Sequence, residues 1–366
     1  MSQRSVLRPQ QQTTGTTPGP PRHRLAHGPL LLPFRGHRYR DGEDLRLEGA
    51  PALYVIEQVS QGRTVQRGVI GALDLGSADG SVIPHENIIP AKVDLQYRIA
   101  RMVHGYPEPI MLASSGGVGA RGLAAVTLRA PDQEFTSPEG TTHRLWACTD
   151  RDEQRSLTEG LDRAPVLVAD GHHRFEAALR CRREFRDRRN ADRVPALLVD
   201  TDLHPLRLSA IHRWLPNLDP AWAIARLSRG ASVTEWHGPA RDPVPGEFML
   251  TGKGRTWSVS AVDRGWTDQA LARHPSAWRD LDTVILHHLL IDRVWASSRA
   301  GEDIRYIHDS AVEHGAPPPE GTLVLLAPPA LNHVRDLAES GTRLPHKTTS
   351  FEPKPLPWQL YYRWDS

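Results

Sequence analysis

The stretch from residue 165 to residue 185, PVLVADGHHRFEAALRCRREF, changes its hydrophobic period at one glycine. Before Gly171 the run PVLVA is short and rich in β-branched residues, which is typical of a buried strand. After it, apolar residues follow the spacing of one helix face: Phe175, Ala178, Leu179, Cys181 and Phe185. The stretch therefore predicts an α+β protein in which a 165–170 strand lies inside a mixed sheet and a 172–186 helix packs on it.

Other segments support a layered α+β chain. ALYVIEQVS (52–60), RTVQRGVIGAL (63–73), PIMLAS (109–114) and TLVLLA (322–327) predict strands, and residues 247–262 predict a hairpin around Gly-Lys-Gly. Residues 91–105 predict a helix with Val93, Tyr97, Ala100 and Met102–Val103 on one face. Residues 281–295 and 331–341 also predict helices, the second with a glycine cap, and the glycine-rich 116–142 region predicts a loop or hairpin.

Composition limits the class of protein. The 366 residues exceed one small domain and predict two lobes or one elaborate unit, and 39% hydrophobic residues can fill a core. The net charge of +2 demands neither nucleic acid nor an acidic membrane. Only four residues are lysine, a pattern typical of codon bias. Two cysteines without a CxxC pair, and no apolar run of membrane length, lead us to expect a soluble cytoplasmic protein.

The strand–helix junction carries the first candidate site. Free backbone N–H groups gather where a helix begins, and the Arg174 fork beside His172 and His173 adds a phosphate-binding group. Asp170 would either cap the helix or help hold a magnesium ion. An N-cap aspartate with two packed histidines explains the same residues equally well. A zinc site is disfavoured, because adjacent histidines rarely bind one ion and no HExxH or cysteine cluster is present.

Two further places carry polar chemistry. In GSVIPHENIIPAKVD (80–94), His85 and Glu86 precede the predicted 91–105 helix, where a carboxylate can act as a general base. A solvated or capping glutamate is the commoner case, and the sequence alone favours it. In LPHKTTSFEPKP (344–355), Lys347 and Thr348 could contact phosphate, although a proline-rich turn with surface lysines is commoner.

Together these places resemble the family known as domain of unknown function 1015. The matching motifs are PFRGHRY (33–39), IPHENIIPAKVD (83–94), VADGHHRFEAAL (168–179), SAIHRWL (209–215) and LPHKTTSFEPK (344–354). Two departures stand out. Only HRYRDGEDLRLEGAP separates PFRG from ALYVIEQ, where the family has a longer segment, and Leu344 and Thr349 replace Met and Ser.

A more distant resemblance links the order of these motifs to ParB/sulfiredoxin-like proteins, including free serine kinases. It implies a ParB/sulfiredoxin-like core over 29–215 with an insertion at 116–164. A second lobe would occupy 216–340, while 341–366 would return to the site. Residues 1–28 are rich in Gln, Thr, Pro, Gly and Arg without an acidic residue, and this composition predicts a disordered basic tail. The resemblance also implies Glu86 as the base with His85 beside it, and phosphate binding by Asp170–Arg174. Arg213, Lys347 and Thr348 would support the phosphates, with Asp170 on the metal.

The leading hypothesis is therefore a small-molecule phosphotransferase acting on serine or a serine-like hydroxyl, with ATP or ADP and Mg²⁺. We expect Glu86 and residues 170–174 to line one pocket, with Arg213 and Lys347 at its rim. The alternative is a nucleotide-binding regulatory protein that phosphorylates no metabolite. A hydrolase or nuclease using the histidine pair receives little weight, because no nucleophile–base–orienter order is visible. No nucleic-acid partner is expected, and the sequence leaves the oligomeric state open.

Overall fold

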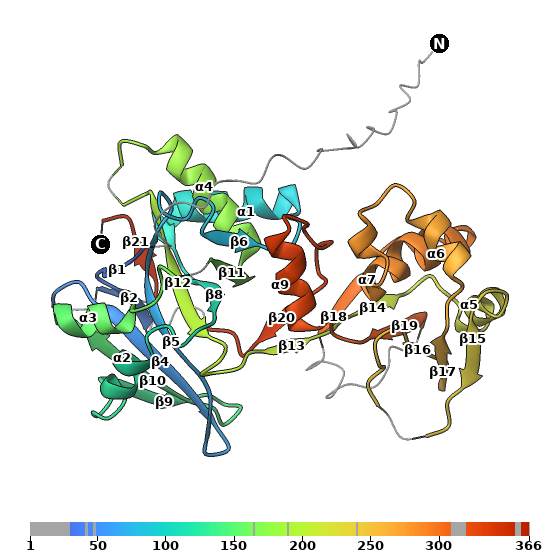
Figure 1. Ribbon diagram of the computed structural model, residues 1–366, viewed down its shortest axis with the longest axis horizontal. Helices are drawn as coiled ribbons and strands as arrows, with labels where there is room; N and C mark the ends of the chain where they lie inside the picture. The colour runs from blue at the N-terminus through green and yellow to red at the C-terminus, as the bar shows by residue number, and fades with distance from the viewer. Residues whose placement is uncertain are drawn as a thin grey trace, which may run out of the picture.

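A computed structural model describes residues 30–40, 43–46, 49–163, 165–188, 190–238, 241–308, 320–355 and 360–365. Most of the described strands belong to two sheets that lie side by side with helices around them (Figure 1). The expected tail at 1–28 lies outside the described residues. Among the described residues, no helix combines the length and apolar character needed to cross a membrane.

The larger sheet is mixed and has nine strands in the order β6-β11-β8-β12-β5-β4-β10-β9, with β1 on β5. Its pairs are antiparallel except β6–β11 and β8–β12, which are parallel. The strands are β1 (Leu31–Leu32), β4 (Leu53–Ser60), β5 (Arg63–Asp74), β6 (Val82–Pro84), β8 (Ile110–Ser114), β9 (Gln133–Thr136), β10 (Thr142–Cys148), β11 (Val166–Asp170) and β12 (Arg193–Asp200). The expectation of a mixed-sheet α+β protein is confirmed.

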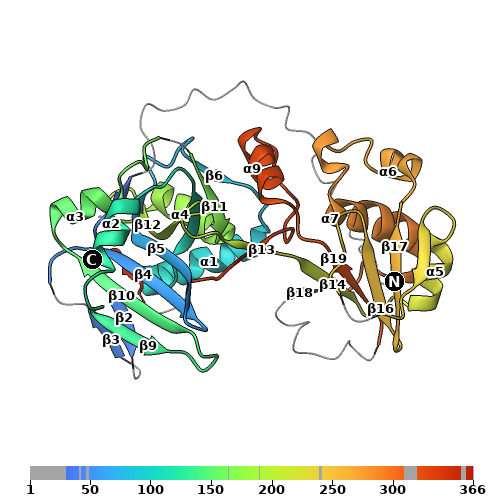
Figure 2. The ribbon, with the colours of Figure 1, turned by 60° about the horizontal axis from the view of Figure 1, so that its bottom comes forward.

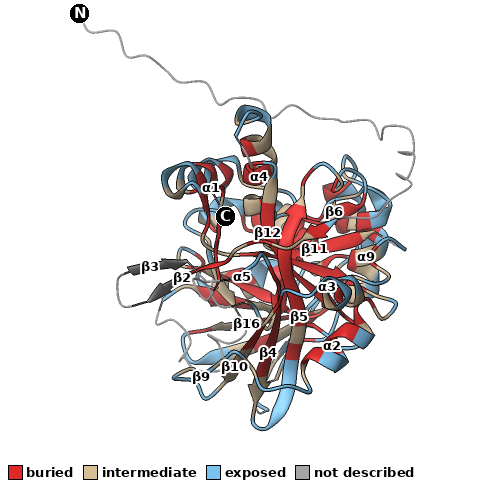
Figure 3. Ribbon diagram, turned by 90° about the vertical axis from the view of Figure 1, so that its left-hand side faces the viewer, coloured by how far each residue is buried: buried red, intermediate tan, exposed pale blue. Residues whose placement is uncertain are grey.

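The strand expected at 165–170 is confirmed as β11, which lies between β6 and β8. Its four residues Val166 to Ala169 are buried, because both faces of the strand are covered (Figure 3). Helix α4 (His172–Glu184) follows directly and buries Phe175, Ala178 and Cys181, as the helical period predicts. The sequence therefore fixes this junction locally.

Helix α1 (Pro90–Val103) packs against α4 and begins at a proline, whose fixed φ suits the first turn. Val93, Tyr97 and Ala100 are buried as predicted, but Met102 is 76% exposed, so its assignment to the inner face is wrong. The last turn of α1 carries Met102 away from α4. The 116–142 region is also more ordered than predicted: it contains α2 (Ala120–Val126), which packs on α3 (Arg151–Leu157), and then β9.

The second sheet has six antiparallel strands in the order β15-β17-β16-β19-β14-β18. They are β14 (Ile211–Leu215), β15 (Ser232–Glu235), β16 (Phe248–Gly252), β17 (Arg255–Ser260), β18 (Arg305–His308) and β19 (Thr322–Leu326). The predicted hairpin is confirmed as β16–β17, with Lys253 and Gly254 at positive φ in its turn. Because β14 pairs here, this lobe begins before the boundary expected at residue 215.

Helices cover this second sheet. They are α5 (Pro220–Leu227), α6 (Arg264–Ala270) and the helix predicted at 281–295, which is a short α7 (Asp282–Val284) continued by a π-helix (Ile285–Val294). A π-helix has a wider turn than the α-helix that the period predicts, and such segments occur often at functional sites. The 331–341 helix is present as α9 (Leu331–Glu339), with Gly341 at positive φ beyond its end.

The C-terminal part of the chain returns to the first lobe. The strand β20 (Ser350–Glu352) pairs with β13 (Arg207–Ser209), and Figures 1 and 2 show this ribbon between the two sheets. Farther on, β21 (Tyr362–Arg363) pairs with β7 (Gly105–Tyr106), which follows α1. A separate hairpin, β2 (His37–Arg40) with β3 (Glu43–Arg46), occupies the short segment after PFRG.

Candidate functional site

The amino-terminal ends of α1 and α4 meet beside the carboxyl end of β11. The backbone N–H of Ile89, the N-cap of α1, donates to Nε2 of His173 at 3.0 Å. Neither helix has an acidic residue in its first turn. Two positive helix ends without nearby acids in those turns create an environment that favours anions.

Asp170 does not cap α4, so that part of its interpretation is wrong. The N-cap is Gly171, with φ 92°, and no side chain caps the helix. Asp170 instead accepts a hydrogen bond from Arg174 at 2.6 Å, and the ammonium of Lys354 lies 3.5 Å from its other oxygen. One residue at the end of the strand and one a turn into the helix thus form an i,i+4 ion pair.

Both terminal nitrogens of Arg174 bind groups of the protein. Besides Asp170, it donates to the carbonyl of Pro109 at 2.5 Å and lies 3.2 Å from the Glu108 carboxylate. Its side chain is only 14% exposed. These contacts favour the structural interpretation of Arg174 over a free phosphate fork, because both terminal nitrogens already bind groups of the protein.

Glu86 binds the turn formed by residues 347–349. The backbone N–H of Lys347 donates to Oε2 at 3.1 Å, and those of Thr348 and Thr349 donate to Oε1 at 3.1 and 2.7 Å. The hydroxyl of Thr349 also donates to Oε1. Burial raises the pKa of Glu86, and the hydrogen bonds from Thr349 oppose that rise.

A buried chain of polar groups leads from Glu86 to α4. Nε2 of His85 lies 2.7 Å from the hydroxyl of Thr349, and Nδ1 of His85 lies 3.2 Å from Nε2 of His172. Burial lowers the pKa of His85 to about 4 and that of His172 well below its ordinary value. Both imidazoles are therefore neutral near pH 7, and they supply hydrogen bonds rather than positive charge.

His173 is also neutral. Burial first, and then the charges of Lys92, Lys347 and His346, lower its pKa to about 4. Its Nε2 accepts the Ile89 N–H, so this histidine joins two helix ends. Thr348 is 1% exposed and its hydroxyl donates to the carbonyl of Pro345, so its side chain supports the turn and does not face solvent.

Three of the four lysines of the chain gather at this place. Lys92 lies in the first turn of α1, and Lys347 and Lys354 flank β20. Burial lowers the pKa of Lys347, and the charges of Lys92 and Lys354 lower it further. Lys354 pairs with Asp170, whereas neither Lys92 nor Lys347 forms an ion pair within the described ranges. The three ammonium groups concentrate positive charge at the site, with Glu86 and Asp170 as the nearby carboxylates.

Arg213 does not lie at a rim, so that expectation is wrong. Its side chain on β14 is fully buried and donates to the carbonyl of Lys347 at 2.8 Å and to Nε2 of His287 at 2.9 Å. It reaches the site only through the backbone of Lys347. The sequence could not show this, because the distance between residues 213 and 347 in space depends on how the second lobe packs.

The residues present do not build a magnesium site on their own. Within the described part of the chain, no group of three or more His, Cys, Asp or Glu side chains could hold a metal ion. Asp170, the predicted ligand, is already neutralised by Arg174 and Lys354. Magnesium prefers carboxylates that are not shared with cations, so Asp170 by itself does not fit the role.

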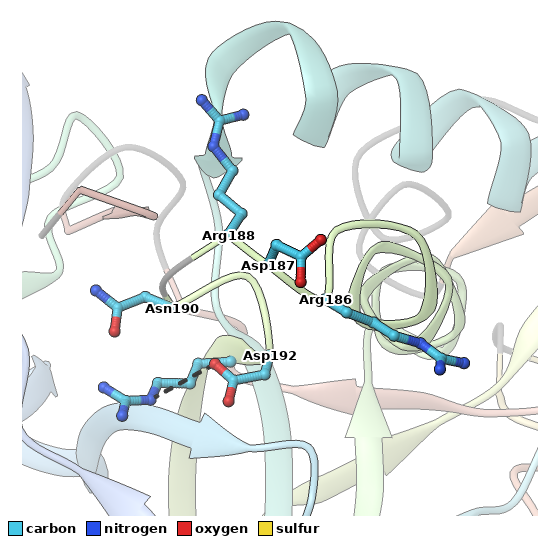
Figure 4. Close-up of a pocket in the computed structure, with 6 residues that line it drawn as sticks. Arg186, Asp187, Arg188, Asn190 and Asp192 are labelled. Carbon is cyan, nitrogen blue, oxygen red and sulfur yellow. Dashed lines mark ion pairs between the residues drawn. The ribbon is translucent and has the colours of Figure 1, made fainter.

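A separate hollow of about 350 Å³ lies beyond the carboxyl end of α4. It is lined by Arg186, Asp187, Arg188, Asn190, Asp192 and Arg193, and Figure 4 shows the guanidinium groups of Arg186 and Arg188 pointing away from each other. Since a helix rises about 1.5 Å per residue, the length of α4 separates this hollow from the site by about 20 Å. The hollow does not belong to the site.

The fold and the site define a two-sheet α+β protein with a cation-rich surface site between two helix ends. The chain belongs to the family described as "Protein of unknown function (DUF1015)", whose model matches residues 36–284. No curated protein sequence matches the chain.

Solved structures match over most of the chain but with low similarity. A free serine kinase in complex with AMP is 15% identical with a TM-score of 0.39, covering 80% of this chain and 91% of that one. A conserved hypothetical protein from Pyrococcus furiosus is 14% identical with a TM-score of 0.40, covering 81% and 96%. SbnI with C-terminal truncation from Staphylococcus aureus is 10% identical with a TM-score of 0.43, covering 80% and 86%.

The structure thus brings His85, Glu86, His172 and the 347–349 turn together from three distant parts of the sequence. Sequence reasoning missed Lys92 as a member of the site, and it placed Lys354 and Thr349 in a candidate stretch without assigning either a role. A signal was present: in a chain with only four lysines, each lysine marks a position where arginine has not been used. Lysine offers a compact ammonium where arginine offers a wide fork.

Proposed function

We propose that this protein is a small-molecule phosphotransferase that transfers a phosphoryl group from a nucleotide to serine or a serine-like hydroxyl. The observation that carries the proposal is the gathering of Lys92, Lys347 and Lys354 around the amino-terminal ends of α1 and α4. Within the described residues, Lys92 and Lys347 form no ion pair, and their ammonium groups together with two helix ends are a suitable counter-charge for a polyphosphate.

The sequence motifs support the same assignment. HE before α1 and DGHHR at the start of α4 occur in the order that resembles free serine kinases, and electrostatic interactions of Glu86 and His173 with the lysines support a common site. We propose that the first sheet with α4 is a ParB/sulfiredoxin-like core and that the sheet containing β14–β19 forms a second domain. The unit formed by 341–366 completes the site, since Lys347 and Lys354 belong to it.

In the proposed reaction, the substrate hydroxyl oxygen forms a bond to the terminal phosphorus of the nucleotide. The bond from that phosphorus to the bridging oxygen breaks, and the electron pair stays with the departing nucleotide. The proton of the hydroxyl passes to Glu86, whose pKa is raised by burial. A magnesium ion would neutralise charge on the nucleotide phosphates, but Asp170 is already paired with Arg174 and offers it no free carboxylate.

The test is a search for phosphoryl transfer by ³¹P NMR with ATP or ADP and a panel containing serine and small alcohols. We expect a phosphorylated product and, in Lys92→Met, nucleotide affinity lower by about ten- to a hundredfold, the equivalent of one lost charge-assisted contact. Lys253→Met is the matched control, because Lys253 pairs with Asp219 on the second lobe. A wild-type protein that neither binds nor consumes nucleotide would overturn the proposal.

One observation favours a second candidate, a nucleotide-binding regulatory protein without metabolite phosphorylation. Both carboxylate oxygens of Glu86 already accept hydrogen bonds from the 347–349 turn. A carboxylate whose two oxygens are both occupied by donors of the protein anchors a loop well. Nucleotide binding without turnover against the full panel would select this candidate.

A further inference from the structure

Residues 343–350 form a strap that both lobes hold. On the side of the first sheet, Glu86 binds the turn, and the backbones of His85 and Asn87 bond Leu344 at 2.7 and 2.8 Å. On the side of the second lobe, hydrogen bonds reach the strap from Trp278, Thr283, Tyr306 and His308 at 3.2–3.4 Å, and from Arg213. The strap contains Lys347, so hydrogen bonds from both lobes influence where this residue lies in the site.

Arg213 is the most deeply buried of the second-lobe residues that form hydrogen bonds with the strap. Its exposed fraction is 0%, and its guanidinium lies 4.6 Å from the ring centre of Tyr306. Its hydrogen bonds go to neutral acceptors: Ile211 O, His287 Nε2 and Lys347 O. Within the described residues it has no ion pair with a carboxylate. Burying a charge without a direct ion pair is costly, and here the hydrogen bonds of Arg213 and the electrostatic attraction of Glu86 offset that cost.

The backbone of Lys347 explains what the arginine does. Lys347 has φ 61°, a left-handed conformation that residues with a β-carbon rarely adopt unless their surroundings hold them there. Glu86 accepts its N–H at 3.1 Å from the first lobe, and Arg213 donates to its carbonyl at 2.8 Å from the second. Hydrogen bonds therefore hold both peptide groups that flank the Lys347 side chain.

We infer that Arg213 is a positioning residue: it holds Lys347 in the left-handed conformation that directs its ammonium group into the cation-rich site, and the second lobe thereby sets the geometry of that site. Calling it a phosphate site rests on the proposed function, whereas the positioning itself does not. The charged groups that face this ammonium group are Lys92, Lys354, Asp170 and Glu86, and the titratable imidazoles of His173 and His346 also interact with it. If the strap were released, the whole electrostatic environment of the Lys347 ammonium group would change.

The test measures the reactivity of each lysine without any ligand. A chain with four lysines allows amine labelling at a series of pH values, with mass spectrometry giving one labelling midpoint for each lysine. In wild type we expect the midpoint of Lys347 below the ordinary lysine value. In Arg213→Met, which keeps an unbranched apolar stem but is shorter and loses every donor, we expect that midpoint to rise by about one pH unit. The midpoint of Lys253 should stay unchanged.

A loss of stability must be separated from a loss of positioning. Leu250→Ala removes a fully buried side chain from β16 in the same sheet without touching the strap, and it should lower Tm while leaving the Lys347 midpoint in place. Arg213→Gln, which keeps one N–H donor pair on a shorter side chain, is the second variant and should give a smaller rise than Arg213→Met. An unchanged Lys347 midpoint in folded Arg213→Met or Arg213→Gln would overturn the inference.

The same labels test the proposed function separately. Protection of Lys92 and Lys347 by ADP in wild type supports nucleotide binding, and absence of protection counts against it. The comparison of midpoints without ligand decides the role of Arg213 in either case. Failure of one proposal is therefore distinguishable from failure of the other.

Discussion

Glu86 is the residue whose environment differs most from a catalytic glutamate in open solvent. Three backbone N–H groups and one hydroxyl converge on its buried carboxylate. In Glu86→Gln the side-chain amide would present its own N–H groups to at least one of these donors. We therefore expect the free energy of unfolding to fall by about 1–3 kcal/mol, the cost of an unsatisfied buried donor.

Urea denaturation without ligand checks this expectation. Glu159→Gln is the control, because that carboxylate pairs with Arg121 at the surface, and exposed pairs contribute little. Equal midpoints for the two variants would show that Glu86 is not an anchor. A lower stability would also mean that lost turnover in Glu86→Gln cannot by itself prove that Glu86 is the base.

Arg174 offers a second test at this scale. If its main role is to hold Asp170, Glu108 and Pro109, Arg174→Lys loses the planar double contact and lowers stability. We expect a loss of about 1–2 kcal/mol, toward the lower range for hydrogen bonds to charged groups. Nucleotide affinity should change little, as measured by calorimetric titration.

Arg183→Lys, at an exposed position on the same helix, is the control for Arg174→Lys and should leave both quantities unchanged. The opposite pattern, with a tenfold or larger loss of affinity and full stability, would return Arg174 to the ligand-binding role. That outcome would mean that the arginine exchanges its acidic partners for the ligand.

At the scale of an element, the start of α4 depends on Gly171. Its φ of 92° is strained for any other residue, and a β-carbon there would lie 3.0 Å from Ile110 Cγ2 and 3.3 Å from Arg174 Nε. Gly116 has a similar φ of 94° with nothing within 4 Å of the same position. Both alanine variants bear the conformational cost of about 1–2 kcal/mol. Only Gly171→Ala adds overpacking, by about 1–3 kcal/mol.

Chemical denaturation of the two variants isolates the packing contribution by difference. If Gly171→Ala is no less stable than Gly116→Ala, then β8 shifts to accommodate the added β-carbon at little cost in free energy. The junction would then tolerate a side chain, and close approach of β8 to the helix start would not explain the glycine.

For the whole molecule, buried histidines make stability depend on pH. The pKa of His85 falls from 6.5 to about 4 on folding, so the unfolded chain binds the proton more readily. Its contribution to stability is present above pH 6.5 and is lost as the pH falls toward 4. At pH 4 the loss is about 3 kcal/mol from this residue. His172 and His287 change in the same direction, whereas the raised pKa of Glu86 acts oppositely.

Unfolding free energies of wild type and His85→Gln between pH 7 and pH 4 measure this effect. The neutral side chain cannot titrate, so the variant should lose less stability over the interval, although it starts lower at pH 7 because the contact with Thr349 changes. Parallel curves for the two proteins would contradict a neutral buried His85.

The sequence by itself determined what local pattern controls. The change of period at Gly171, the hairpin around Lys253 and the inner face of α1 follow from spacing within a few residues. The motifs also singled out His85, Glu86, His172 and Lys347 as members of one place. Helix α2 was missed because its seven residues carry too short a pattern to show a period.

Only the tertiary structure decided the roles of these residues. Glu86 and Thr348 are 262 positions apart, and Arg213 and Lys347 are 134 apart, so the return of the strap between two lobes creates both contacts. The same return brings Lys92 beside Lys347 and buries Arg213 away from solvent. Hydrophobic period determines which face of an element is buried. Which charges then meet depends on packing between elements, because electrostatic and hydrogen-bond energies depend on distances in space.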